Sequence, residues 1–138
     1  MPKLPKVVGI VLCERLDFPA PARIPCLVGI FLSLRFKRFP SSPANFTVYF
    51  ALHNGIGQGI IDLTIGRMET EEDIFATKEE VYLPGLGMYR HCLLRVQGCR
   101  FPAPGNYVLS IRFKAKGQEV GEELAYRYLE VFLDQEEI

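Results

Sequence analysis

The sequence predicts an all-β protein: a single antiparallel β-sandwich of about eight strands, with immunoglobulin-like or jelly-roll connections. The clearest segment is 101–113, FPAPGNYVLSIRF, where two prolines and a glycine precede an alternating run. There Tyr107, Leu109, Ile111 and Phe113 alternate with Val108, Ser110 and Arg112, which is typical of a strand with one apolar face. The same pattern recurs along the chain, and no segment sustains the 3.6-residue apolar period of a helix.

The first half of the chain predicts four strands. The run 7–13 is continuously apolar, which predicts a strand covered on both faces. A second strand is expected over 26–36, with Gly29 marking a bulge or a close backbone approach. Strand 46–53 alternates, placing Phe46, Val48, Phe50 and Leu52 on one side and Thr47, Tyr49, Ala51 and His53 on the other. The glycine-rich turn 54–59 leads into strand 60–68.

The second half predicts four more strands and a frayed end. A charged turn over 69–73 precedes a weak strand, 74–83, and the glycine loop 84–87 precedes strand 89–97. After strand 107–113, the turn 116–118 leads to strand 119–133, in which Arg127 interrupts an apolar row. Residues 134–138 are expected to fray. Because no repeat or linker interrupts the pattern, the sequence predicts one domain over 1–138.

The balance of basic and acidic residues argues against some classes of binding partner. Sixteen basic and sixteen acidic residues cancel, which removes the simplest argument for nucleic acid or an anionic membrane. The charges are segregated, since residues 81–118 carry six basic and no acidic groups while residues 119–138 carry one and seven. Strands from such blocks are expected to attract each other across a sheet, or to form opposite-signed patches on the surface.

Membrane and export signals are not expected. No segment reaches the eighteen or so apolar residues of a membrane helix. The N-terminal apolar run ends at Glu14 and Arg15 without a small-residue cleavage site. We therefore expect a cytoplasmic protein whose four cysteines are reduced thiols.

Cysteines and histidines are the soft ligands of the chain, and their spacing does not favour a metal site. Neighbouring residues on a strand point to opposite faces, so His91 and Cys92 are not expected to bind one ion. Cys92 and Cys99 also differ in parity unless a bulge at Gly98 intervenes. Cysteines in apolar runs act as small hydrophobic residues, so we expect core thiols and no metal or cofactor.

Catalytic and nucleotide motifs are also missing. The sequence has no GxSxG elbow and no HExxH pair, which favours a non-enzymatic protein. The glycines of 53–59 lack the Lys and Ser/Thr of a phosphate loop. The segment 35–39, RFKRF, extended by Arg95, Arg112 and Lys114, offers a weak alternative, stacking and phosphate contacts for single-stranded nucleic acid.

The order of motifs VLCERL, LVGIF, FTVYFAL, GxGQG, FPAPGNYVLSI and GQEVGEE is similar to a family of small bacterial proteins of unknown function. That resemblance spans most of the chain and implies a sandwich, a bacterial source and possible carriage by a phage or mobile element. It transfers no activity. The P-G-x-Y hairpin also resembles the strand entry of immunoglobulin-like modules, where a tyrosine pins a corner.

The leading functional hypothesis is a protein-binding or assembly module that self-associates. Its candidate contact residues are outward-facing or flanking ones, Tyr49, His53, Tyr126, Arg127 and Tyr128. The alternative is a small-ligand or carbohydrate site in a cleft between the glycine loops 54–59 and 84–87. There Asn54, Tyr89 and His91 are expected to supply hydrogen bonds and a stacking face. A metal-binding protein is the third hypothesis.

Overall fold

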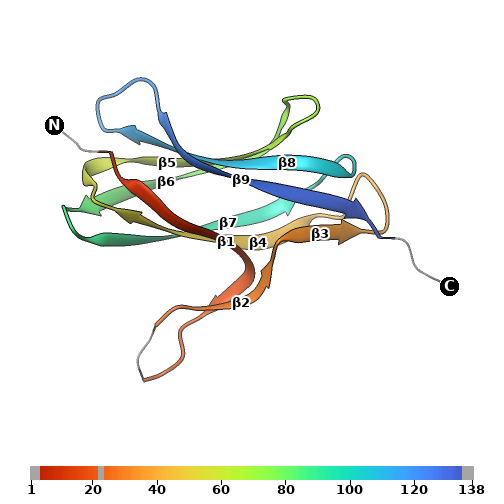
Figure 1. Cartoon of the computed structure of the whole chain (residues 1–138), viewed down its shortest axis with the longest axis horizontal. Helices are drawn as coiled ribbons and strands as arrows, with labels where there is room; N and C mark the ends of the chain where they lie inside the picture. Colours follow the sequence, from red (N-terminus) through yellow and green to blue (C-terminus); the bar gives the residue numbers. More distant parts are fainter. Residues whose placement is uncertain (1–3, 22–23, 135–138) are drawn as a thin grey trace.

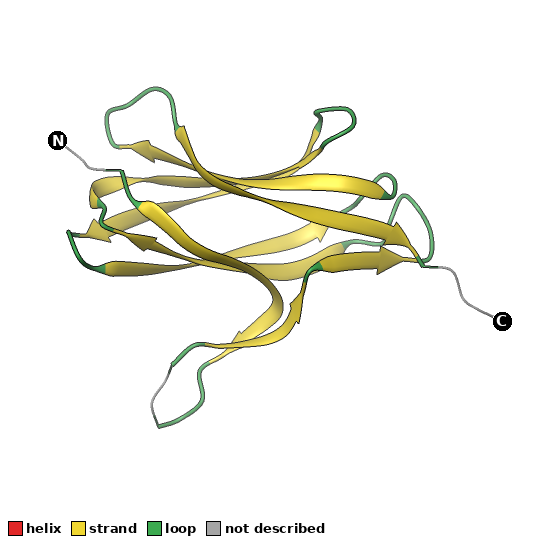
Figure 2. Cartoon of the chain, viewed as in Figure 1, coloured by secondary structure: helices red, strands yellow, loops and turns green. Residues whose placement is uncertain are grey.

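The computed structural model describes residues 4–21 and 24–134, which form nine strands and, over those ranges, no helix. Figure 1 and Figure 2 show two sheets packed face to face. The strands are β1 (Lys6–Asp17), β2 (Cys26–Phe31), β3 (Ser33–Phe36), β4 (Ala44–His53), β5 (Ile56–Arg67), β6 (Asp73–Pro84), β7 (Tyr89–Cys99), β8 (Gly105–Ala115) and β9 (Glu122–Leu133).

The sheets have four and five strands. The first has the order β2-β1-β4-β7, and the second has the order β3-β9-β8-β5-β6. The predicted β-sandwich is therefore confirmed. Its pairs are antiparallel as expected, apart from β3 and β9, which run parallel.

Two-residue alternation builds the core. On β8, Tyr107, Leu109, Ile111 and Phe113 are all buried, as the sequence predicted. The inward row of β4 is likewise buried and consists of Phe46, Val48, Phe50 and Leu52. These rows from the two sheets belong to one hydrophobic cluster, so burial of apolar surface holds the layers together.

The expected single strand over 26–36 is wrong. It is divided at Leu32, and β2 pairs with β1 in one sheet while β3 pairs with β9 in the other. The chain crosses between the layers at this point. Apolar residues suit both halves, so the run contains no composition change that marks the crossing.

The prediction that the first strand is covered on both faces is also wrong. β1 lies inside the four-stranded sheet, but Val8 is exposed on its outer side. Gly9 adopts a φ of 60°, and the register with β4 shifts between Val8 and Val11. Apolar residues thus line a face that no second layer covers.

Two glycines lie at irregular positions in the strands. Gly29 has a φ of 73°, and a Cβ there would lie 2.7 Å from Cγ of Glu14, so it is the Glu14 side chain that closely approaches this position. Gly98 has a φ of 70° in a bulge where Ala44 pairs with Cys99 and Phe46 with Val96. The backbone N–H of Gly98 donates to Oδ1 of Asn45 at 2.8 Å.

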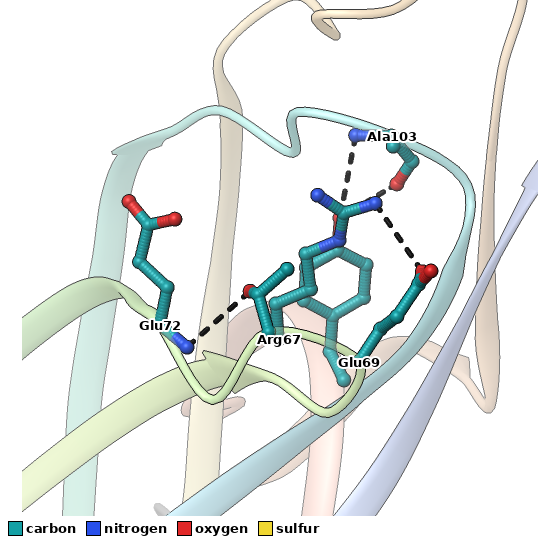
Figure 3. A network of polar contacts seen from close by, with 6 residues as sticks. Arg67, Glu69, Glu72 and Ala103 are labelled. Carbon is teal, nitrogen blue, oxygen red and sulfur yellow. Dashed lines mark hydrogen bonds and ion pairs between the residues drawn. The ribbon is translucent and has the colours of Figure 1, made fainter.

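One end of the sandwich is held by polar contacts. The hydroxyl of Tyr107 donates to the carbonyl of Ala103 at 2.6 Å, which confirms the expected tyrosine corner. Nearby, Arg67 pairs with Glu69 at 3.5 Å, and the Glu72 N–H donates to Oγ1 of Thr70 at 3.4 Å. Figure 3 shows the Arg67 guanidinium lying between the charged turn and the segment at Ala103.

The segregated charges meet across the five-stranded sheet. Asp62 on β5 lies opposite Lys78 on β6 and Arg112 on β8. Arg112 in turn lies opposite Glu123 on β9. Opposite charges on neighbouring strands favour their pairing, and the position of Arg112 opposite Glu123 joins the basic block 81–118 to the acidic block 119–138.

At the C-terminal end, the Asp134 N–H donates to the Phe36 carbonyl at 2.8 Å, so the predicted fraying does not include this residue. The rest of the predicted frayed tail, 135–138, lies outside the described residues. Over residues 4–21 and 24–134, no helix is long and apolar enough to cross a membrane.

Candidate binding surfaces

Four side chains form a ring cluster on the outer side of β4 and β7: Tyr49, His53, Tyr89 and His91. The rings of His53 and Tyr89 are stacked with centroids 4.3 Å apart, and those of Tyr49 and His91 with centroids 5.9 Å apart. The Tyr49 hydroxyl and Nδ1 of His91 lie 2.5 Å apart and share a hydrogen bond. The ring cluster therefore unites two residues from each of the expected sites.

Hydrogen bonds join the two glycine loops between which a cleft was expected. Residues 56–59 belong to β5, and hydrogen bonds join the remaining turn to the loop after β6. The N–H of Gly85 donates to the Gly55 carbonyl at 3.1 Å, and the N–H of Gly87 donates to Oδ1 of Asn54 at 2.6 Å. Asn54 thus holds the two loops together, and Tyr89 and His91 lie on the sheet face instead.

The residues expected on β9 separate onto two sides. Tyr126 and Tyr128 are exposed on the outer face of the five-stranded sheet, with ring centroids 5.5 Å apart. The adjacent phenol of Tyr126 raises the pKa of Tyr128. Arg127 points the other way and donates from Nη1 to the Ile10 carbonyl on β1. It links the two sheets and does not belong to a tyrosine surface.

Burial distinguishes three of the thiols from the fourth. Cys13, Cys92 and Cys99 are buried, whereas Cys26 is exposed, contrary to the expectation from its apolar run. Burial raises the pKa of Cys92 and of Cys99 to about 11, and it also raises the pKa of Cys13. These three thiols are protonated near neutral pH and are poor nucleophiles and poor metal ligands.

The alternation of side chains along a strand also keeps the cysteine and histidine side chains apart. Cys92 faces the core while His91 is exposed, as their adjacency predicted. The bulge at Gly98 turns Cys99 inward as well, but seven residues of strand place it roughly 23 Å from Cys92. Among the residues the structure describes, no three His, Cys, Asp or Glu side chains come close enough to hold a metal ion.

The edge strand β2 is a surface that the sequence did not single out. Figure 1 shows the end of β1 and β2 projecting from the body as a hairpin. On its far side, β2 pairs with no other strand of the described chain. Ile24, Ile30 and Leu32 are 65%, 59% and 70% exposed. The available signal was the run 24–34, which contains no charged residue.

A hollow of about 570 Å³ lies near the end of β3 and includes part of the segment 35–39 that the sequence had singled out. We call it the basic pocket. Four cationic side chains line it, Arg35, Lys37, Arg38 and Arg100. Arg100 follows β7 and is distant in sequence from the other three, so no spacing rule could have included it.

The proposed nucleic-acid surface is not assembled as expected. Arg95 lies on the four-stranded sheet, where its Nη1 donates to the Glu14 carbonyl at 3.0 Å and to Oγ1 of Thr47 at 3.1 Å. Phe36 and Phe39 are half-buried and pack edge-to-face with centroids 6.0 Å apart. They anchor the loop after β3 to the core.

Comparisons with known proteins support the fold. The sequence matches no protein-family model and no curated protein. Among solved structures, the C-terminal domain of Wzt is similar, with a TM-score of 0.55 and 14% sequence identity over 95% of this chain and 77% of that chain. At this identity the likeness shows a shared sandwich fold alone.

Proposed function

We propose that this protein is a non-enzymatic assembly module that binds a second copy of itself by pairing β2 with β2. The observation that carries the proposal is an apolar, uncharged edge strand whose outer side has no partner in the described chain. An exposed edge of this kind offers free backbone N–H and C=O groups to another strand.

Its charge pattern favours a second copy as the partner. In an antiparallel pair about a two-fold axis, the residues near the axis lie opposite their own counterparts, so a charge there would face an identical charge. The run 24–34 contains no such charge. Natural edge strands that stay unpaired commonly carry lysine or an inward-pointing charge, and β2 has neither.

The hairpin geometry supports the same proposal. A two-stranded projection buries little apolar surface and is marginal in water by itself. Phe18, Ile24 and Ile30 remain exposed on or beside this hairpin. Pairing with a second copy would extend the four-stranded sheet to eight strands and cover these side chains.

The chemistry of the thiols supports a non-enzymatic, cytoplasmic protein. Raised pKa values keep Cys13, Cys92 and Cys99 protonated. All four cysteines are free, which fits a reducing compartment.

The order of the strands supports immunoglobulin-like rather than jelly-roll connections. In the five-stranded sheet, β3 pairs in parallel with β9, which is followed by β8 and β5.

Ile30→Lys tests the assembly proposal. The substitution places a charge on the edge strand at a side chain that is already exposed, so the fold should tolerate it. Light scattering after gel filtration should give a dimer mass for the native protein and a monomer mass for the variant. Val120→Lys, at an exposed position in the loop before β9, is the matched control and should remain dimeric.

Backbone protection locates the contact. Hydrogen exchange of the amides over 26–31 should slow as the native protein is concentrated, and this change should vanish in the Ile30→Lys variant. A native protein that stays monomeric at every concentration, or a lysine variant that dimerises normally, contradicts the proposal.

The ring cluster favours a second candidate function, carbohydrate or small-ligand binding on the outer side of β4 and β7. Exposed aromatic rings beside groups that form hydrogen bonds suit the apolar face and hydroxyls of a sugar. Tyr89→Ala should abolish any thermal stabilisation that a panel of sugars gives the native protein. Tyr82→Ala removes another exposed tyrosine, on β6, and is the control. A panel without any stabilising sugar would dismiss this candidate.

A further inference from the structure

The basic pocket brings together three arginines from different segments of the chain. Arg35 comes from β3, Lys37 and Arg38 from the following loop, and Arg100 from the end of β7. Among the residues that the structure describes, those that line the hollow include no Asp or Glu. The three guanidinium groups at this hollow produce a local positive potential that favours an anion.

The floor of the basic pocket is held firmly. Ser41 is fully buried; its N–H donates to the Phe101 carbonyl at 2.9 Å, and the Phe101 N–H donates to Oγ of Ser41, also at 2.9 Å. Phe36 packs against Phe101 with centroids 5.7 Å apart. Because both ends of the loop contact the core, its cations are presented on a rigid base.

Two of the arginines are also oriented. Nη1 of Arg100 donates to the Ser41 carbonyl at 3.3 Å, which directs its guanidinium across the loop. The Arg35 guanidinium lies over the Phe132 ring, 4.8 Å from its centroid. Guanidinium groups held in this way are suited to binding oxyanions through paired hydrogen bonds.

A second hollow, of about 350 Å³, adjoins the basic pocket, since Arg35 and Phe36 line both. We call it the apolar notch. It lies between the β2 hairpin and the start of β4, and its remaining lining is mostly hydrocarbon: Ile30, Phe31, Leu34, Ala44 and Phe46, with Glu14, Gly29 and Asn45. The two hollows thus join a cationic part to an apolar part.

We propose that the basic pocket and the apolar notch together bind a phosphate-bearing amphiphile, with the phosphate among the arginines and the hydrocarbon chain in the notch. Binding at these two hollows does not depend on dimer formation through β2. The proposal concerns binding alone and involves no covalent step.

Titration calorimetry with three probes separates the two parts of the site. Octyl phosphate should bind saturably at one site per chain, and more tightly than inorganic phosphate. Octyl glucoside, which has the same hydrocarbon chain and a neutral head, should bind at least tenfold more weakly than octyl phosphate. The two octyl compounds are used below their critical micelle concentrations.

Paired charge variants test the location. Arg38→Gln with Arg100→Gln should weaken octyl phosphate binding by about tenfold for each arginine removed. Lys114→Gln with Lys116→Gln changes the net charge equally at the far end of β8 and should leave the affinity unchanged. Thermal unfolding of both double variants verifies that they fold.

Each contrary result is decisive. Equal affinity for inorganic phosphate and octyl phosphate overturns the role of the notch, and equal affinity for octyl glucoside overturns the role of the arginines. Absence of binding, or equal losses in the two double variants, overturns the site. The molecular mass measured in the same samples keeps this outcome separate from the assembly proposal.

Discussion

At the scale of single residues, the direction of a side chain decides what the position tolerates. Leu109 is fully buried in the core, while its neighbour Ser110 faces outward between Thr64 and Tyr126. Leu109→Asp places an unpaired carboxylate among apolar side chains, which costs about 4 kcal/mol or more. We expect this variant to fail to accumulate as folded protein.

Ser110→Asp is the matched control for that prediction. It adds the same carboxylate one residue away, on a face open to water, and should change the free energy of unfolding by less than about 0.5 kcal/mol. Expression yield and urea unfolding measure both variants. Similar behaviour of the two variants would contradict the assignment of which β8 side chains face the core and which face outward.

The tyrosine corner gives a smaller residue-scale effect. Tyr107→Phe removes the hydroxyl that donates to the Ala103 carbonyl and leaves the buried ring in place. We expect a loss of about 1–2 kcal/mol in the free energy of unfolding, measured with urea. Tyr82→Phe removes an exposed hydroxyl and should have no measurable effect. Equal losses in both variants would exclude a role for the corner in stability.

At the scale of elements, the β1–β2 hairpin depends on Gly29. Any side chain at this position faces both a positive φ and contact with Glu14, whereas Gly9 has a positive φ and open space around its Cβ position. Gly9→Ala should cost about 1 kcal/mol, and Gly29→Ala should cost roughly 2 kcal/mol. Urea unfolding of the two variants compares them.

Adding Glu14→Ala to Gly29→Ala isolates the contact. Because the shorter side chain removes the atoms that crowd position 29, the double variant should regain most of the difference between the two glycine variants. No recovery would mean that the backbone conformation alone accounts for the loss. Hydrogen exchange over 26–31 then shows whether the damage is confined to the hairpin.

Local pattern predicted most elements, because one covered face imposes a two-residue period on a strand. Residues 46–53 and 107–113 carry that period, and the sandwich was evident from them. The division of 26–36 was not predictable, since apolar residues serve equally in a strand that stays in its sheet and in one that crosses. Arg127 gave a usable signal, because it occupies the inward row of β9 and therefore points between the sheets.

The candidate surfaces were less predictable because they depend on contacts between distant segments. The pairing of β4 with β7 brings Tyr49 and His53 to His91 and Tyr89, a register that neither strand specifies alone. Arg100 reaches the basic pocket because β7 ends beside the loop after β3, where Ser41 pairs with Phe101. Sequence spacing contains no information about either approach.

At the scale of the whole molecule, the core thiols connect stability to pH. Cys92 and Cys99 have a pKa of about 11 in the folded state against an ordinary value of 9.0, because burial disfavours the thiolate. Between these values the unfolded chain loses protons that the folded chain retains. The buried thiols therefore make their full contribution to the free energy of unfolding below pH 9. That contribution is lost as the pH rises toward 11.

Urea unfolding at intervals from pH 8 to pH 10.5 measures this decline. Cys99→Ala keeps a small apolar side chain in the core and removes one of the titrating groups, so its stability should fall less steeply with pH than that of the native protein. Cys26→Ala changes an exposed thiol and should leave the slope unaltered. A native protein whose stability is constant over this range, or a Cys99→Ala variant with the native slope, would show that the buried thiols do not govern the alkaline transition.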